Sequence, residues 1–182
     1  MRPIVKMLAV AALLAVFASV AGNVAAAGGG PQTRLTRSQP AGYEAVLLRA
    51  INQVRAQRGL PELRSSGLLA TAAERHSRRM AARGFFDHNS PNGSPFWKRV
   101  GQFYSSRGFD QWSVGENLAY GSPGLSAEGT VRAWMGSPGH RANLLSTAWR
   151  EVGLAAAHAA SAPGVYGGRK TTIVTADFGI RR

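Results

Sequence analysis

The chain has 182 residues and no cysteine, which excludes disulfides and thiolate chemistry and leaves packing alone to hold the fold. It carries 22 Lys and Arg against 9 Asp and Glu, a formal net charge of +13, which favours attraction to an anionic cell envelope, anionic lipid or nucleic acid. Because the basic residues are scattered and not gathered in blocks, we interpret most of them as a solvated surface and do not expect nucleic acid as the partner.

The N-terminal stretch predicts a secretory signal peptide. Basic residues precede an apolar run over 7–20, and Ala25 and Ala27 have the spacing that signal peptidase prefers, so we expect cleavage after Ala27. The run is short for a membrane span, although a retained N-terminal anchor is the alternative. We therefore expect a secreted protein, extracellular or periplasmic, and the lack of disulfides in an exported domain favours a bacterial source.

The remaining residues indicate a leader and one folded domain. Residues 28–42 are rich in Gly, Pro, Ser and Thr without periodicity, which is typical of a disordered leader. Residues 43–182 alternate periodic segments with turn signals and are numerous enough for a domain with its own core.

The first half of this domain is predicted to be mainly helical. Apolar residues at helical spacing predict a helix that begins at Tyr43 and ends at the "QRGLP" turn, and a second helix over 66–83. Residues 85–110 are irregular apart from a helical turn at 96–100. Alternation of apolar and other residues predicts a strand over 112–121.

The second half adds two helices and two strands. A helix over 126–135 precedes the helix within "SPGHRANLL" at 137–145, and strands are predicted over 150–160 and 170–179. Helices mostly come first and strands later, an order that favours an α+β fold with an antiparallel sheet.

Three polar residues are hard to explain as surface positions. His88 lies in the irregular segment "FDHNSPNG", and His140 follows the expected helix cap Ser137 and Pro138. The first turn of a helix opposes protonation of an imidazole, so we expect His140 to be neutral, as a ligand or a base. Glu116 shares a strand face with apolar residues, where a carboxylate is costly unless it is paired. Two neutral imidazoles and a carboxylate would form a zinc shell with an open position if they converged, and a hydrogen-bonded polar cluster is the alternative.

The other histidines and the tryptophans are interpreted as structural. His76 lies within an apolar helix face that we expect to be buried, and His158 is expected to be half exposed and without a role. That helix face contains Leu68, Leu69, Ala72, Ala73, His76 and Met80, and core or rim positions are expected for Trp97, Trp112, Trp134 and Trp149. No nucleophile motif of the G-x-S-x-G type and no H-E-x-x-H motif occurs.

Several segments together resemble the CAP superfamily, also called SCP-like or CRISP/antigen 5/pathogenesis-related-1 proteins, and more narrowly its cysteine-free bacterial branch. The segments that carry the resemblance span about residues 43–180 and include "FFDHNSP", "VGENLAYG", "SPGHRANLL" and "VTADFG", in the family's order. The resemblance implies an α-β-α sandwich with a central antiparallel sheet between helical layers.

The resemblance also implies a central cleft with two histidines and an acidic residue. It assigns His88, Glu116 and His140 as metal ligands, with zinc the expected ion. The candidate cleft residues are His88, Ser90, Glu116, Asn117, His140 and Asn143. Many eukaryotic relatives have a second glutamate after the tryptophan that corresponds to Trp134, whereas "MGSPGH" follows here.

The functional hypotheses divide into binding and catalysis. We favour a binding protein without turnover, whose cleft holds a divalent metal, a lipid or a glycan at the cell envelope. The alternative is a metal-dependent, protease-like hydrolase in which Glu116 ligates the metal or activates water as a general base. The sequence leaves the physiological ligand and the oligomeric state open.

Overall fold

The computed structural model describes residues 35–36 and 42–182. The signal peptide expected at 1–27 and most of the leader expected at 28–42 lie outside these residues. In chain order the elements are β1 (Leu35–Thr36), α1 (Tyr43–Ala56), β2 (Arg64–Ser65), α2 (Gly67–Arg83), α3 (Phe96–Gly101), β3 (Trp112–Gly121), α4 (Ala127–Gly136), α5 (Pro138–Leu145), β4 (Glu151–Ala162), a 3-10 turn (Gly164–Tyr166) and β5 (Arg169–Arg181).

Three long strands form the body of one sheet, in the order β4, β5, β3. The pairs β3/β5 and β4/β5 are both antiparallel, and β3 is the edge strand on its side. Short strands β1 and β2 pair with the far side of β4. The antiparallel sheet expected from the alternating segments is therefore confirmed, and every expected helix and strand is present.

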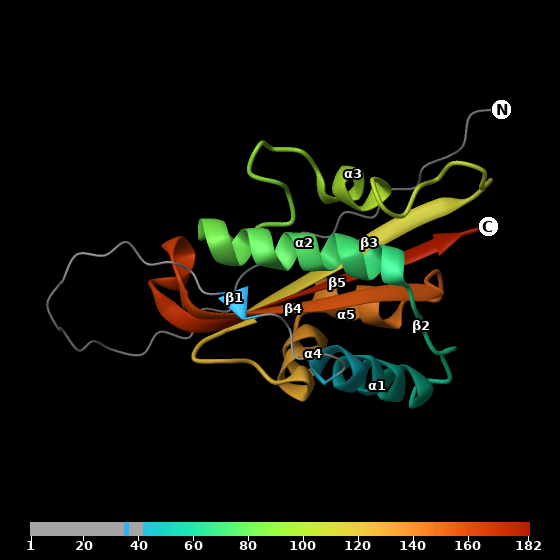
Figure 1. Cartoon of the computed structure of the whole chain (residues 1–182). Coiled ribbons are helices and arrows are strands. Elements are labelled where there is room, and N and C mark those ends of the chain that lie inside the picture. The colour runs from blue at the N-terminus through green and yellow to red at the C-terminus, as the bar shows by residue number, and fades with distance from the viewer. Residues whose placement is uncertain (1–34, 37–41) are drawn as a thin grey trace, which may run out of the picture.

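Helices cover both faces of this sheet, as Figure 1 shows: α2 and α3 lie on one face and α1, α4 and α5 on the other. A strand in such a sheet sends alternate side chains to the two layers. On β3, Val114 packs with residues of α2 and α3, while Ala119 joins the layer that contains α1 and α4. The result is an α-β-α sandwich.

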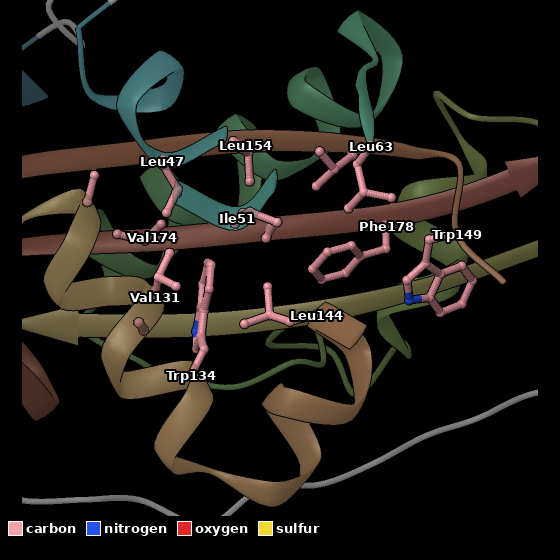
Figure 2. Packing of buried hydrophobic residues seen from close by; sticks show 14 of the residues in the cluster. Leu47, Ile51, Leu63, Val131, Trp134, Leu144, Trp149, Leu154, Val174 and Phe178 are labelled. Atoms are coloured by element: carbon pink, nitrogen blue, oxygen red, sulfur yellow. The ribbon is translucent and has the colours of Figure 1, made fainter. Parts of the chain in front are cut away.

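The main core lies between the sheet and the α1/α4/α5 layer (Figure 2). Trp134 of α4 is 1% exposed, and its indole Nε1 donates a hydrogen bond of 2.9 Å to the Leu118 carbonyl oxygen of edge strand β3. Trp149, also buried, stacks on Phe178 of β5. Trp97 and Trp112 are half buried against a second core cluster, so the core or rim positions expected for the four tryptophans are correct.

Helix α2 meets the sheet at very short range. A Cβ atom on Gly153 of β4 would lie 2.0 Å from the Ala70 nitrogen and from the Leu69 carbonyl carbon. Only a glycine permits this approach of helix backbone to strand backbone.

Three expectations are wrong in detail. Leu68, expected on the buried face of α2, is 43% exposed because the face that meets the sheet is centred on Leu69, Ala73 and Met80. Ser137 occupies the N-cap position of α5, but its side chain makes no capping hydrogen bond. Leu35–Thr36, inside the segment expected to be disordered, pair with β4 as strand β1.

Of the described residues, none belongs to a helix long and apolar enough to cross a membrane.

Candidate functional site: a buried carboxylate that holds a histidine

Glu116 lies in the middle of β3 and points toward the α2/α3 layer. It shares this face with Val114 and Leu118, as strand alternation requires, and its side chain is completely buried. An ionised carboxylate in such a place needs hydrogen bonds and a compensating charge. The structure supplies both, from two segments that are distant in sequence.

His88 and Arg99 occupy the two oxygens of Glu116. The Nδ1 atom of His88, in the loop between α2 and α3, lies 2.8 Å from Oε1, and Nη2 of Arg99 donates a hydrogen bond to Oε2. Burial opposes ionisation of Glu116, but the bond to His88 and the charge of Arg99 hold its pKa below the ordinary value. Because the carboxylate accepts, Nδ1 of His88 carries the hydrogen and Nε2 is the ring atom left for a ligand.

His140 lies in the first turn of α5 and is half buried. Burial, followed by the charge of His88, lowers its pKa to about 4. The imidazole is therefore neutral at physiological pH, as expected from the sequence. His88 precedes β3 in the chain and His140 follows it, and β3 is the edge strand of the sheet on this side.

Asn117 and Asn143, expected as cleft residues, hold α5 against β3. The side-chain amide of Asn117 donates to the His140 carbonyl oxygen at 2.9 Å, and the amide of Asn143 donates to Asn117 Oδ1 and to the Glu116 carbonyl oxygen at 2.9 and 3.1 Å. Asn117 is 0% exposed. These bonds place His140 relative to Glu116, so both asparagines act through the position of α5.

Ser90, the remaining expected cleft residue, belongs to the turn after His88. Its backbone nitrogen donates to the Ser94 carbonyl oxygen and its carbonyl oxygen accepts from Gly93, both at 2.8 Å. This turn closes the loop that carries His88.

His76 of α2 holds the same loop through a hydrogen bond to its backbone. It is 0% exposed, as expected for a core histidine, and its Nε2 donates a hydrogen bond of 2.8 Å to the carbonyl oxygen of Asp87, the neighbour of His88. Burial lowers the pKa of His76 to about 4, so it is neutral.

Asp177 is a second buried carboxyl group that the sequence analysis missed. It lies directly opposite Glu116 in the β3/β5 register and is 0% exposed. Burial, reinforced by the charge of Glu116, raises the pKa of Asp177 well above its ordinary value. A charged residue among the apolar residues of "TIVTADFG" is the same signal that singled out Glu116, and it could have identified Asp177. The sequence analysis also missed Arg99.

The expected three-residue metal shell is not assembled in this arrangement. Within residues 35–36 and 42–182, no three His, Asp or Glu side chains are grouped so that they could hold one metal ion. Both oxygens of Glu116 are engaged by His88 and Arg99. The imidazoles of His88 and His140 are nitrogen donors of a kind that suits a transition metal, and Glu116 is bonded to the first of them.

The fold is that of the CAP family. The family model described as "CAP: Cysteine-rich secretory protein family" matches residues 48–178, so the chain belongs to this family. The family is named for cysteine-rich proteins, whereas this chain contains no cysteine.

Among relatives, the chain is similar to the uncharacterized protein YkwD of Bacillus subtilis. The two are 34% identical over 127 residues, which is 68% of this chain and 47% of YkwD. The chain thus spans about half the length of this curated relative.

Solved bacterial structures agree with the fold. The chain is similar to an extracellular protein with an SCP domain from Bacillus anthracis (25% identity, TM-score 0.56, 81% of this chain and 45% of that one). An outer surface protein of Borrelia burgdorferi matches with a TM-score of 0.68 over 83% of this chain and 100% of that chain, at 19% identity.

Proposed function

We propose that this CAP protein works outside the cytoplasm as a binding protein, and that His88 and His140 hold a divalent transition metal ion, with zinc the expected ion. Glu116 orients His88 and is not itself a ligand. Water or a group of the bound partner would complete the coordination.

The observation that carries the proposal is the hydrogen bond between His88 Nδ1 and the buried Glu116 carboxylate. Histidines that bind metals commonly donate their other ring hydrogen to a carboxylate, which sets the tautomer and makes the free nitrogen a better ligand. The His88 ring donates from Nδ1 to Glu116, which leaves Nε2 as the nitrogen that can bind a metal. The low pKa of His140 favours a neutral imidazole, the form that a metal ligand must have.

The same observation favours binding over hydrolysis. A general base must be able to take a proton from water beside the substrate. Glu116 is completely buried, with one oxygen bonded to His88 and the other to Arg99. In this arrangement both oxygens are engaged within the protein.

The location outside the cytoplasm rests on the N-terminal signal and on kinship. The matched protein of Bacillus anthracis is described as extracellular and that of Borrelia burgdorferi as an outer surface protein. A basic protein of net charge +13 is also suited to remain near an anionic envelope.

Calorimetric titration of zinc into metal-stripped protein, produced from the full chain, tests the site. We expect one ion per chain, and a loss of affinity of about 10-fold or more in His88→Ala, in His140→Ala and in Glu116→Gln, since loss of a ligand or its orienting partner has effects of this order. His158→Ala is the matched control, because this half-buried histidine lies on β4 and contacts Thr172. Affinity in that variant should equal that of the parent.

Two results would contradict the proposal. Zinc binding that survives in both His88→Ala and His140→Ala would place the ion elsewhere. A parent protein that takes up no zinc would remove the metal hypothesis and favour the lipid or glycan alternative.

A further inference from the structure

Arg99 is a buried arginine with partners that all belong to the site. It lies in the short helix α3, is 5% exposed, and extends beneath the loop that carries His88. A guanidinium group removed from water must be compensated by acceptors and by an opposite charge. Its partners therefore indicate what the residue contributes.

Arg99 bonds to the backbone of His88 and to the carboxylate that holds the His88 ring. Nη1 donates a hydrogen bond of 3.1 Å to the His88 carbonyl oxygen, and Nη2 donates to Oε2 of Glu116. The other oxygen of Glu116 holds the His88 ring at Nδ1. These three hydrogen bonds form a closed network. Arg99 fixes the backbone of His88 directly, and it fixes the ring of His88 through the Glu116 carboxylate.

This hydrogen-bond network also contains an ion pair. Glu116 is completely buried and faces a second buried carboxyl group, Asp177, in the neighbouring strand. Arg99 is a buried cation in contact with Glu116, and the two groups form an ion pair. A charge-assisted hydrogen bond of this kind holds the carboxylate in one orientation, with Oε1 toward His88.

We propose that Arg99 is the positioning residue of this site: it holds the Glu116 carboxylate in place through Oε2 and fixes the backbone of His88, so that Nδ1–H of the imidazole stays bonded to Oε1 and the ring keeps a single tautomer. The inference rests on the proposed function only for the identity of the ligand. The state of the His88 ring can be observed without any ligand.

The test compares Arg99→Met, Arg99→Lys and the parent by ¹⁵N NMR of the histidine rings in metal-free protein from the full chain. In the parent we expect His88 as the tautomer with hydrogen on Nδ1. Arg99→Met should populate the Nε2–H tautomer, because Glu116 no longer holds Nδ1 firmly. Arg99→Lys keeps the charge and loses the two-armed contact. It should show a smaller change, while the signals of His158 stay unchanged in both variants.

A second buried arginine provides the matched control. Arg55 of α1 is 0% exposed and donates to the carbonyl oxygens of Pro61, Leu144 and Ser146, with no carboxylate involved. Arg55→Lys should lower stability without changing the tautomer of His88. A role of Arg99 in packing alone would make the two arginines behave alike.

The outcomes separate this inference from the proposed function. A change of His88 tautomer in Arg99→Met supports the inference even if the parent binds no zinc, a result that would count against the proposed function alone. If the parent does bind zinc, Arg99→Met should weaken binding about 10-fold or more. Folded Arg99→Met with the tautomer of the parent would overturn the inference. If Arg99→Met does not fold, unchanged His88 signals in Arg99→Lys would overturn it equally.

Discussion

At the scale of single residues, two carboxyl groups share the centre of the sheet with one neighbouring cation. Glu116 and Asp177 lie opposite each other, and Arg99 forms its ion pair with Glu116. Neither side-chain oxygen of Asp177 has a well-formed hydrogen bond to the described part of the chain. Burial and the charge of Glu116 hold the pKa of Asp177 well above its ordinary value, which favours the neutral acid.

Asp177→Asn should therefore stabilise the protein most at high pH. A carboxyl group with a raised pKa in the folded state contributes stability that is complete below its unfolded pKa of about 4 and is lost as the pH rises through the folded value. Asparagine is neutral throughout. We expect the gain in the free energy of unfolding to be clearly larger at pH 8 than at pH 5, because only the aspartate is opposed by burial and by Glu116 when it ionises.

Urea unfolding at the two pH values measures this difference. Asp110→Asn, at an exposed position, is the control and should show no such dependence. An equal effect of Asp177→Asn at both pH values would mean that Asp177 ionises normally in the folded protein.

At the scale of elements, the site depends on how closely α2 lies on β4. Helix α2 carries His76, which holds the loop of His88, and Ser77, whose hydroxyl donates to the Ala155 carbonyl oxygen of β4 at 3.3 Å. The contact at Gly153 sets the depth of the helix. The register of α2 on the sheet thus fixes the loop from below, and α5 fixes His140 from the other face through Asn117.

Gly153→Ala should be strongly destabilising. The added methyl group would meet backbone atoms of Leu69 and Ala70 at 2.0 Å, so α2 must move away from the sheet as a whole. We expect a loss in the free energy of unfolding of about 3 kcal/mol or more, at or above the upper range for overpacked cores. Thermal or urea unfolding measures it.

The control for this substitution is Gly136→Ala, where a new Cβ would meet no atom within 4 Å at the end of α4. That variant should be neutral or more stable by up to about 1 kcal/mol, the helix preference of alanine over glycine. A Gly153→Ala protein as stable as the parent would show that α2 can shift freely over β4.

At the scale of the whole molecule, the N-terminal segment and the excess of basic residues both concern where the protein acts. Expressed from its full sequence in a bacterial host, the chain should be exported and shortened to begin at Gly28. Intact mass and N-terminal sequencing of the exported protein measure this. Ala25→Arg should block cleavage because the peptidase requires small residues at alternate positions, whereas Ala26→Arg should be tolerated. An exported parent chain that retains residues 1–27 would favour the retained anchor instead.

Much of the fold could be predicted from the sequence because the local spacing of apolar residues distinguishes helices from strands. Strand β3 was predicted with its observed ends, and Glu116 was singled out because a carboxylate among apolar neighbours needs a partner. The motif "SPGHRANLL" identified the start of α5 and the neutral state of His140. The order of the segments indicated the CAP family.

The tertiary structure alone decided which groups meet. His88, Arg99 and Glu116 come from a loop, a helix and a strand, and no spacing rule joins them. Leu68 is 43% exposed because packing on the sheet centres the buried face of α2 on Leu69, Ala73 and Met80. Asn117 and Asn143 were expected as cleft residues, and in the structure they hold α5 against β3. Burial and long-range partners raise the pKa of Asp177 and orient His88, and both effects depend on distances that exist only in the folded chain.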